Sequence, residues 1–156
     1  MKRLIKRILL GLLIAFALIQ FYRPSRENPP VDQAKTIEQS IAIPQNVETV
    51  LSRSCNDCHS SKTIWPWYSN IAPVSWMLVD HVKDGRRELN FSEWRDFSTR
   101  KKRRKLEEVC EQVNKGNMPL DSYLWLHRDA KLSPVDRNLL CDWANAEKAK
   151  IQAAAK

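Results

Sequence analysis

Two cysteines and a histidine stand together in the stretch Cys55-Asn56-Asp57-Cys58-His59. Residues three apart share one face of a helical turn, so both sulfurs can reach the two vinyl groups on one side of a porphyrin. This spacing is the attachment signature of c-type haem. The thiols of Cys55 and Cys58 would form thioethers, and the imidazole of His59 would become the proximal iron ligand. The stretch therefore predicts one covalently bound haem c.

The same cysteine pair fits two other kinds of site. A Cys-x-x-Cys pair alone can be a redox-active dithiol or half of a zinc site. A dithiol does not need His59, and neighbouring ligands at Cys58 and His59 would be cramped around tetrahedral zinc. Haem attachment is the better interpretation. A thiol-disulfide oxidoreductase that uses Cys55 and Cys58 is kept as an alternative.

A methionine in a proline-containing loop is the candidate for the sixth iron ligand. In Gly116-Asn117-Met118-Pro119-Leu120 the glycine ends a predicted helix, and the proline fixes the backbone that presents the thioether of Met118. Methionine is an iron ligand in cytochromes c. We therefore predict Met118 as the distal iron ligand, with His127 as the runner-up. The alternative role for Met118 is to fill a gap in the core.

The two predicted iron ligands decide between electron transfer and catalysis. An iron bound by both His59 and Met118 has no open position for a substrate, which argues against an enzyme. The predicted function is therefore that of a mono-haem c-type cytochrome, which carries electrons by Fe(II)/Fe(III) cycling. The alternative is a haem peroxidase or a ligand-sensing haem protein, and it requires that Met118 be absent from the iron or easily displaced.

Residues 1–22 have the pattern of an export signal, in which cations precede an apolar run from Ile8 to Ile19. The apolar stretch continues past Ala15-Phe16-Ala17, which favours an uncleaved signal anchor over a cleaved signal peptide. By the positive-inside rule, the C-terminal part leaves the cytoplasm. The prediction is a bacterial inner-membrane protein whose C-terminal domain lies in the periplasm. After cleavage it would instead be a soluble periplasmic protein.

Cys110 and Cys141 are the two cysteines outside the haem motif. An even remainder in an exported protein suggests a disulfide. The bond would close about 30 residues and would hold the loop of Met118 between two helices. Two separate buried thiols, each packed as a small apolar residue, fit the sequence equally well.

Length and charge limit the class of protein. The 156 residues are enough for one domain and too few for two good cores. Four of the cations behind the net charge of +8 lie in the first seven residues, so the rest of the chain is only mildly basic. No base-reading motif accompanies this charge, and a nucleic-acid partner is not expected.

Proline and polar residues set the predicted domain limits. Residues 23–43 contain three prolines without a sustained apolar period and are predicted to be a flexible linker. The haem-binding, cytochrome c-like domain is placed at residues 44–147, and residues 148–156 are predicted to be an alanine-rich tail.

Apolar residues recur at helical spacing within this domain, so we expect an all-α fold. The prediction is a small cytochrome c-like helical domain around one covalently bound haem, preceded by an N-terminal apolar helix. Four helices are expected in the domain: at residues 44–54, leading into Cys55; at 73–85, ending at Gly85; at 100–115, ending before Gly116; and from Ser133 and Pro134 onwards.

Six cations stand in a row from Arg100 to Lys105. Like charges at the start of a helix oppose the helix dipole, so these residues are not there for helix stability. A solvated helix face is one explanation. The other is a docking patch for anionic lipid or for an acidic redox partner.

Together these motifs resemble the bacterial haem-binding domain family and, in outline, a class I cytochrome c. The resemblance covers about residues 41–147 and rests on Cys55-Asn56-Asp57-Cys58-His59, Trp65-Pro66-Trp67-Tyr68, Ile71-Ala72-Pro73-Val74-Ser75-Trp76, Asn90-Phe91-Ser92-Glu93-Trp94 and Met118-Pro119-Leu120. It implies a membrane-anchored, periplasm-facing mono-haem protein. The partners that it implies are redox proteins, such as di-haem peroxidases or respiratory components. Cys110 and Cys141 stand where apolar residues are expected in that family, which leaves their role open.

Overall fold

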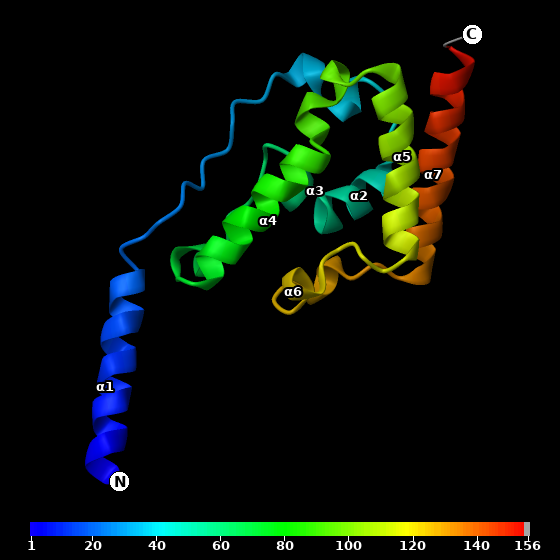
Figure 1. Ribbon diagram of the computed structural model, residues 1–156. Helices are drawn as coiled ribbons and strands as arrows, with labels where there is room; N and C mark the ends of the chain where they lie inside the picture. The colour runs from blue at the N-terminus through cyan, green and yellow to red at the C-terminus, as the bar shows by residue number, and fades with distance from the viewer. Residues whose placement is uncertain (155–156) are drawn as a thin grey trace.

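The computed structural model of the protein describes residues 1–154, and the regular elements in that part of the chain are all helices (Figure 1). The predicted all-α class is therefore confirmed. The α-helices are α1 (Lys2–Ile19), α2 (Gln45–Ser54), α3 (Asn56–His59), α4 (Val74–Glu88), α5 (Thr99–Asn114), α6 (Asp121–Leu124) and α7 (Pro134–Ala153). Short 3₁₀ helices lie between them: η1 (Gln33–Lys35), η2 (Ile37–Gln39), η3 (Trp67–Asn70), η4 (Phe91–Asp96) and η5 (Arg128–Ala130).

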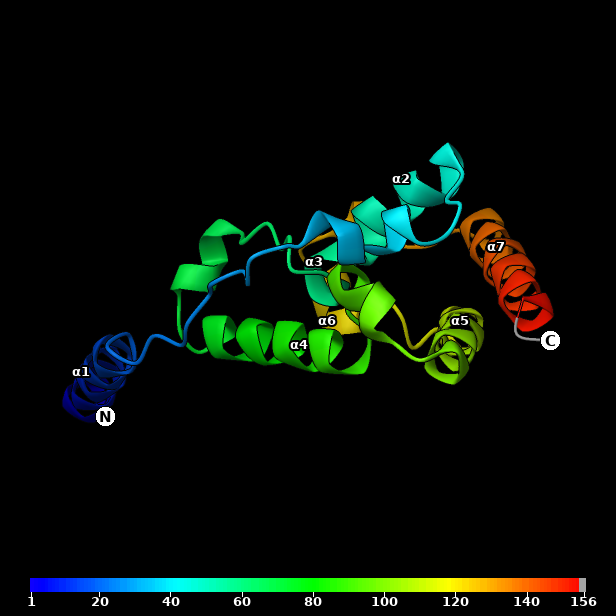
Figure 2. The same ribbon diagram turned by 90° about the horizontal axis from the view of Figure 1, so that it is seen from above.

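Helices α5 and α7 lie side by side and contribute a large part of the core (Figures 1 and 2). Leu106 of α5 and Leu140 of α7 are among the most deeply buried side chains. A disulfide bond between Cys110 and Cys141 also joins the two helices. The segment of residues 115–133, which connects them, is therefore held at both of its ends.

The start of α7 has the cap that the sequence predicts. The hydroxyl of Ser133 accepts a hydrogen bond from the Asp136 N–H (3.1 Å), and the Asp136 carboxylate accepts one from the Ser133 N–H (2.9 Å). At its other end α7 continues to Ala153, and Ile151 packs against the core. Residues 148–153, predicted as a tail, are thus part of this helix. Residues 155–156 lie outside the described part of the chain.

Helix α2 leads directly into the cysteine motif, as expected. Its residues Val47 and Val50 are buried. At Cys55 the backbone leaves helical geometry, with φ at −128°, and α3 begins with the next residue. Two hydrogen bonds bridge this break, from the Cys55 N–H to the Leu51 carbonyl and from the His59 N–H to the Cys55 carbonyl, both 2.9 Å. The motif is therefore fixed to a buried helix.

Helix α4 lies against α3 and is longer than predicted (Figure 2). The expected stop at Gly85 is wrong, because the helix continues to Glu88. Val79 and Val82 hold it in the core, each with a relative exposure of 1%. The glycine has another role inside the helix, at the contact with α3 described below.

Part of the predicted linker is folded onto the domain. Thr36 and Ile37 have relative exposures of only 1% and 2%, and η1 and η2 pack against η4. Further upstream, the Gln20 amide donates to the Ala72 carbonyl (3.1 Å) and accepts from the Ala72 N–H (2.9 Å). The folded unit therefore begins before residue 44. Long-range contacts, which the local sequence pattern does not reveal, order this segment.

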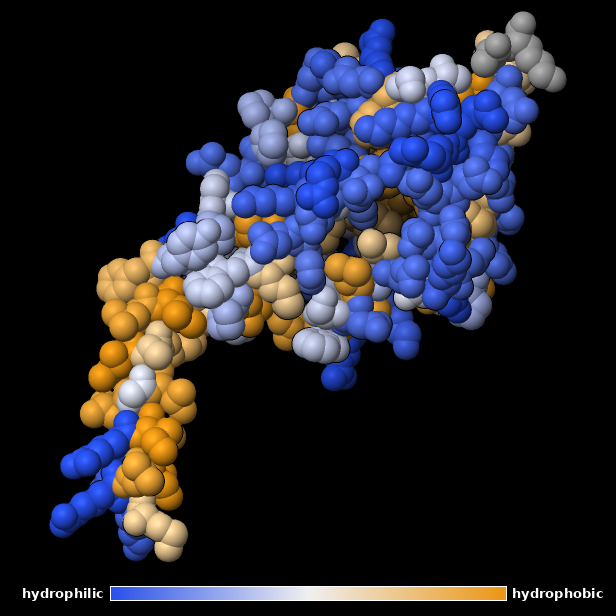
Figure 3. Space-filling model, viewed as in Figure 1, coloured by the Kyte–Doolittle hydropathy of each residue, from blue (hydrophilic) through white to orange (hydrophobic). Residues whose placement is uncertain are grey.

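Helix α1 stands away from the rest of the chain, and its apolar side chains are exposed along its length (Figures 1 and 3). Its apolar part, from Ile8 to Ile19, is about 18 Å long, whereas the hydrocarbon core of a bilayer is about 30 Å thick. Four cations occupy the turns before it. Within residues 1–154 no helix is long and apolar enough to cross a membrane. The predicted inner-membrane anchor, and the location derived from it, are therefore wrong.

Replacing Cys110 and Cys141 together with serine should lower the free energy of unfolding by roughly 3–4 kcal/mol. Without the bond, the unfolded chain gains conformational entropy in the segment between the two cysteines, which are 31 residues apart in sequence. Urea unfolding followed by circular dichroism measures the difference. The wild type with its disulfide reduced is the matched control and should unfold like the double variant. Equal stability of the oxidised wild type and the double variant would contradict this role of the bond.

Candidate cofactor site

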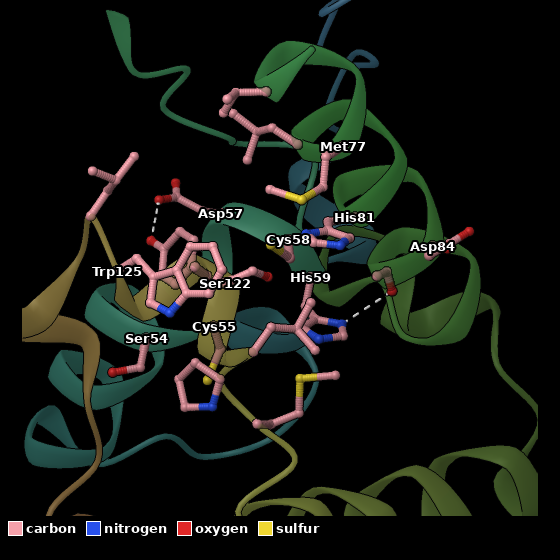
Figure 4. A pocket seen from close by; sticks show the side chains of 18 of the residues that line it. Ser54, Cys55, Asp57, Cys58, His59, Met77, His81, Asp84, Ser122 and Trp125 are labelled. Carbon is pink, nitrogen blue, oxygen red and sulfur yellow. Dashed lines mark hydrogen bonds between the residues drawn. The ribbon is translucent and has the colours of Figure 1, made fainter. Parts of the chain in front are cut away.

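A cavity of about 540 Å³ opens between α3, α4 and the segment of residues 118–126 (Figure 4). Cys55, Cys58, His59 and Met118 all line it. A second cavity of about 410 Å³ shares Cys55, His59 and Met118 with the first. Both volumes lie in the range of about 300–1,000 Å³ that small-molecule sites occupy. The fold therefore gathers the predicted haem residues around a space large enough for a cofactor.

Asp57, between the two cysteines, anchors the attachment turn. Its carboxylate accepts hydrogen bonds from the Ile64 N–H (3.0 Å) and from the Tyr123 hydroxyl (2.9 Å). Its backbone carbonyl accepts a third from the Thr63 hydroxyl (2.6 Å). The turn is thus tied to the loop that follows it and to the segment that carries Met118.

Two backbone carbonyls orient the His59 ring. One belongs to a residue within α4, and the other to the residue directly after its end. Its Nδ1 lies 3.1 Å from the Gly85 oxygen and 3.0 Å from the Leu89 oxygen. A ring nitrogen that faces two acceptors must carry the proton, which leaves Nε2 with a free lone pair. Burial lowers the pKa of His59, so the ring is neutral near pH 7. A neutral imidazole held in this way is prepared to bind a metal through Nε2.

Gly85 lies at the closest contact between α4 and the attachment turn. A Cβ atom at this position would stand 2.5 Å from the carbonyl oxygen of Cys58 and 3.1 Å from the Cys58 Cβ. Any larger residue would therefore push α4 away from α3. The glycine makes it possible for the Gly85 and Leu89 carbonyls to reach His59.

Cys55 and Cys58 are free thiols in the structure. Burial raises the pKa of Cys55 to about 12 and that of Cys58 to about 11. A reactive dithiol depends on the opposite shift, because the thiolate is the nucleophile. The surroundings of the two sulfurs thus argue against thiol-disulfide exchange.

The end of α5 brings Met118 to the cavities. Gly116 has a φ of +73°, the left-handed conformation that commonly follows the last residue of a helix. The N–H groups of Asn117 and Met118 then donate to the Gln112 carbonyl, at 3.0 and 3.4 Å. The chain turns at this point, and the Met118 side chain lines both cavities.

His127, the runner-up ligand, lines neither of these two cavities. Its ring stacks on Tyr123 with the centroids 4.0 Å apart, and its Nδ1 lies 3.3 Å from the Tyr68 hydroxyl. Both tyrosines line the larger cavity. The fold therefore brings Met118 to the cavity wall and holds His127 behind the tyrosines.

Two residues that the sequence analysis did not single out, Met77 and His81, also line the larger cavity (Figure 4). They are four residues apart on α4, and Gly85 and Glu88 continue the same face. This helical period was the signal that could have found them. Both residues lie within the helix expected at residues 73–85, but nothing in the sequence showed that this face borders a cavity.

The family model for a haem-binding domain matches residues 14–146. The chain belongs to the haem-binding domain family. The resemblance to the haem-binding domain family that was inferred from the motifs is thereby confirmed. The match begins well before residue 41, in keeping with the folded segment that precedes α2. No curated protein and no solved structure matches this haem-binding domain.

The residues present in this haem-binding domain fit a haem. Two protonated thiols, a neutral imidazole with Nε2 free and a methionine thioether surround cavities of suitable size. In cytochromes c, an imidazole and a methionine thioether bind the iron, and two thiols form thioethers with the porphyrin vinyl groups. Within residues 1–154 no three His, Cys, Asp or Glu side chains gather to hold a metal ion. The zinc alternative therefore lacks a ligand cluster.

Replacing Gly85 with alanine should weaken both the fold and haem binding, because the added Cβ would collide with the Cys58 carbonyl. We expect the free energy of unfolding to fall by about 1–3 kcal/mol and the ratio of haem to polypeptide to fall with it. Urea unfolding and absorbance measure the two effects. Gly11→Ala is the matched control, since a Cβ added there would meet no atom within 4 Å apart from its chain neighbours and the nearby backbone of its own helix. Unchanged stability and haem content in Gly85→Ala would contradict the proposed contact.

Proposed function

We propose that this haem protein is a mono-haem c-type cytochrome that carries electrons between other proteins. The observation that supports it most is that Cys55, Cys58, His59 and Met118 line the same cavity. A pair of thioether-forming cysteines, a proximal imidazole and a distal methionine are the residues that an electron-transfer haem c requires.

In this proposal Cys55 and Cys58 attach the haem covalently. Each sulfur would bond to one carbon of a vinyl group, and the thiol proton would end on the other carbon. The Cys58 N–H donates to the Cys55 carbonyl at 3.2 Å, which keeps the two residues on a single helical turn. The turn is rigid because Asp57 is bonded to residues outside it.

His59 and Met118 are the proposed iron ligands. The haem supplies one-electron Fe(II)/Fe(III) chemistry when bound. The chain keeps the two ligands in place: the carbonyls of Gly85 and Leu89 orient His59, and the linked helices α5 and α7 hold both ends of the segment that contains Met118. With both ligands engaged, no position remains for a substrate. We therefore infer a carrier and not an enzyme.

The proposed partner is an acidic redox protein. Helix α5 begins with the basic run, in which Arg100 and Arg104 are exposed. Clustered cations attract a partner of opposite charge and orient it. Val109 and Gln112 of the same helix line the second cavity. A protein docked on α5, such as a di-haem peroxidase, would thus lie close to the haem.

Covalent attachment predicts that haem remains on the wild-type chain after denaturation. Cys55→Ser and Cys58→Ser should each weaken or abolish the haem signal on a denaturing gel, after expression with a cytochrome c maturation system. Cys110→Ser is the matched control, because it removes a cysteine outside the attachment turn, and it should keep the signal. Wild-type protein whose mass shows no added haem would refute the c-type proposal.

Met118→Ala should remove the sulfur-to-iron charge-transfer band of the ferric protein and lower its reduction potential. It should also open the iron to carbon monoxide, since the sixth position becomes vacant. Met77→Ala is the matched control, because Met77 lines the same cavity from α4 and should keep the band. An unchanged spectrum in Met118→Ala would exclude Met118 as the ligand. Rapid carbon monoxide binding by the wild type would favour a peroxidase or a ligand sensor.

A further inference from the structure

One member of the basic run differs from the others in its surroundings. Lys105 has a relative exposure of 5%, and it is the one lysine or arginine that is buried within residues 1–154. Its Nζ lies 2.6 Å from Glu108 Oε2 and 3.5 Å from Glu88 Oε2. Burying an ammonium group costs free energy even when the group is paired. The position therefore calls for an explanation other than solubility.

Lys105 belongs to the wall of the second cavity. Glu88, Glu108 and His59 line the same cavity. Glu88 lies on α4, between the two residues whose carbonyls orient His59. The buried ammonium group and its two more exposed carboxylate partners thus connect α5 to the part of α4 that fixes the proposed proximal ligand.

The charges of this cluster act on His59. Lys105 and Glu88 line the same cavity as the His59 ring, so the charges of both side chains lie close to the ring. A buried site screens such charges less than water does, so they act at longer range there. Any further positive charge bound at Nε2 would experience the same field.

We propose that Lys105 raises the reduction potential of the haem by holding one buried positive charge in the cavity wall, between Glu88 and Glu108. This inference rests on the proposed function. Oxidation of the iron adds one positive charge to the site, and a nearby ammonium group disfavours that change. Without Lys105 the carboxylates of Glu88 and Glu108 would keep only their more exposed partners, Arg87 (3.9 Å) and Arg104 (3.3 Å). The ferric form would then become more stable relative to the ferrous form.

The test is an equilibrium redox titration of the haem-loaded protein with soluble mediators, which needs no partner. Lys105→Met should shift the midpoint potential to a lower value, and Lys105→Arg should restore it because the charge returns. Lys102→Met is the matched control. Lys102 lies one turn earlier on α5 and lines neither cavity, and its Nζ donates to the Arg95 carbonyl (3.4 Å). Its shift should be much smaller.

Ionic strength separates a buried charge from an exposed one. Between about 0.01 M and about 1 M salt the Debye length falls from roughly 30 Å to roughly 3 Å. The small shift of Lys102→Met should vanish over this range, and the shift of Lys105→Met should persist. A Lys105→Met potential equal to that of the wild type at both salt concentrations would overturn the inference.

If Lys105→Met does not fold, two milder variants test whether the charge of Lys105 affects the midpoint potential. Glu88→Gln and Glu108→Gln each leave Lys105 with less opposing charge, so both should raise the midpoint potential. Unchanged potentials in both would overturn the inference. Failure of the proposed function gives a different result, because it would show as wild-type protein without attached haem or without a reversible iron couple.

Discussion

The contact between α3 and α4 is the constraint on which the site depends. At Gly85 the helix passes so close to the Cys58 backbone that no side chain fits between them. Only at this distance can the Gly85 and Leu89 carbonyls both reach Nδ1 of His59. The same contact therefore selects the tautomer of the ring and fixes its direction. Both properties are needed before Nε2 can serve as a ligand.

Arg86, next to this glycine, extends the contact to the rest of the domain. Its guanidinium donates to the Ser60 carbonyl and to the Thr63 hydroxyl, both at 2.8 Å, and to the Asn28 side-chain oxygen at 2.6 Å. The exit of the attachment turn is thus bonded both to α4 and to the segment that precedes the domain core. This network gives a physical reason why the family match extends upstream of α2.

Local features of the sequence were enough to predict part of the fold and of the site. The Cys-x-x-Cys-His spacing, the cap at Ser133 and the left-handed Gly116 depend on neighbours in the chain, and the structure has the cap and the glycine as predicted. Contacts between distant residues were out of reach. Ile37 is buried through contacts beyond the supposed linker, and Gly85 is required by a backbone on another helix. In sequence, a glycine that ends a helix cannot be told from a glycine that allows another helix to pack closely against it.

The basic run is a second case in which the sequence alone does not show the role of each residue. In sequence, Lys105 is the last of six equal cations, and the whole run fits a solvated helix face. In the fold, a helix of 3.6 residues per turn cannot expose all six, so one of them must face inward. That residue meets Glu88 on α4 and Glu108 on its own helix, and the pairing makes its burial tolerable. The run therefore divides into a surface suited to a partner and a buried charge suited to the cofactor, and only the position of α4 decides which residue has which role.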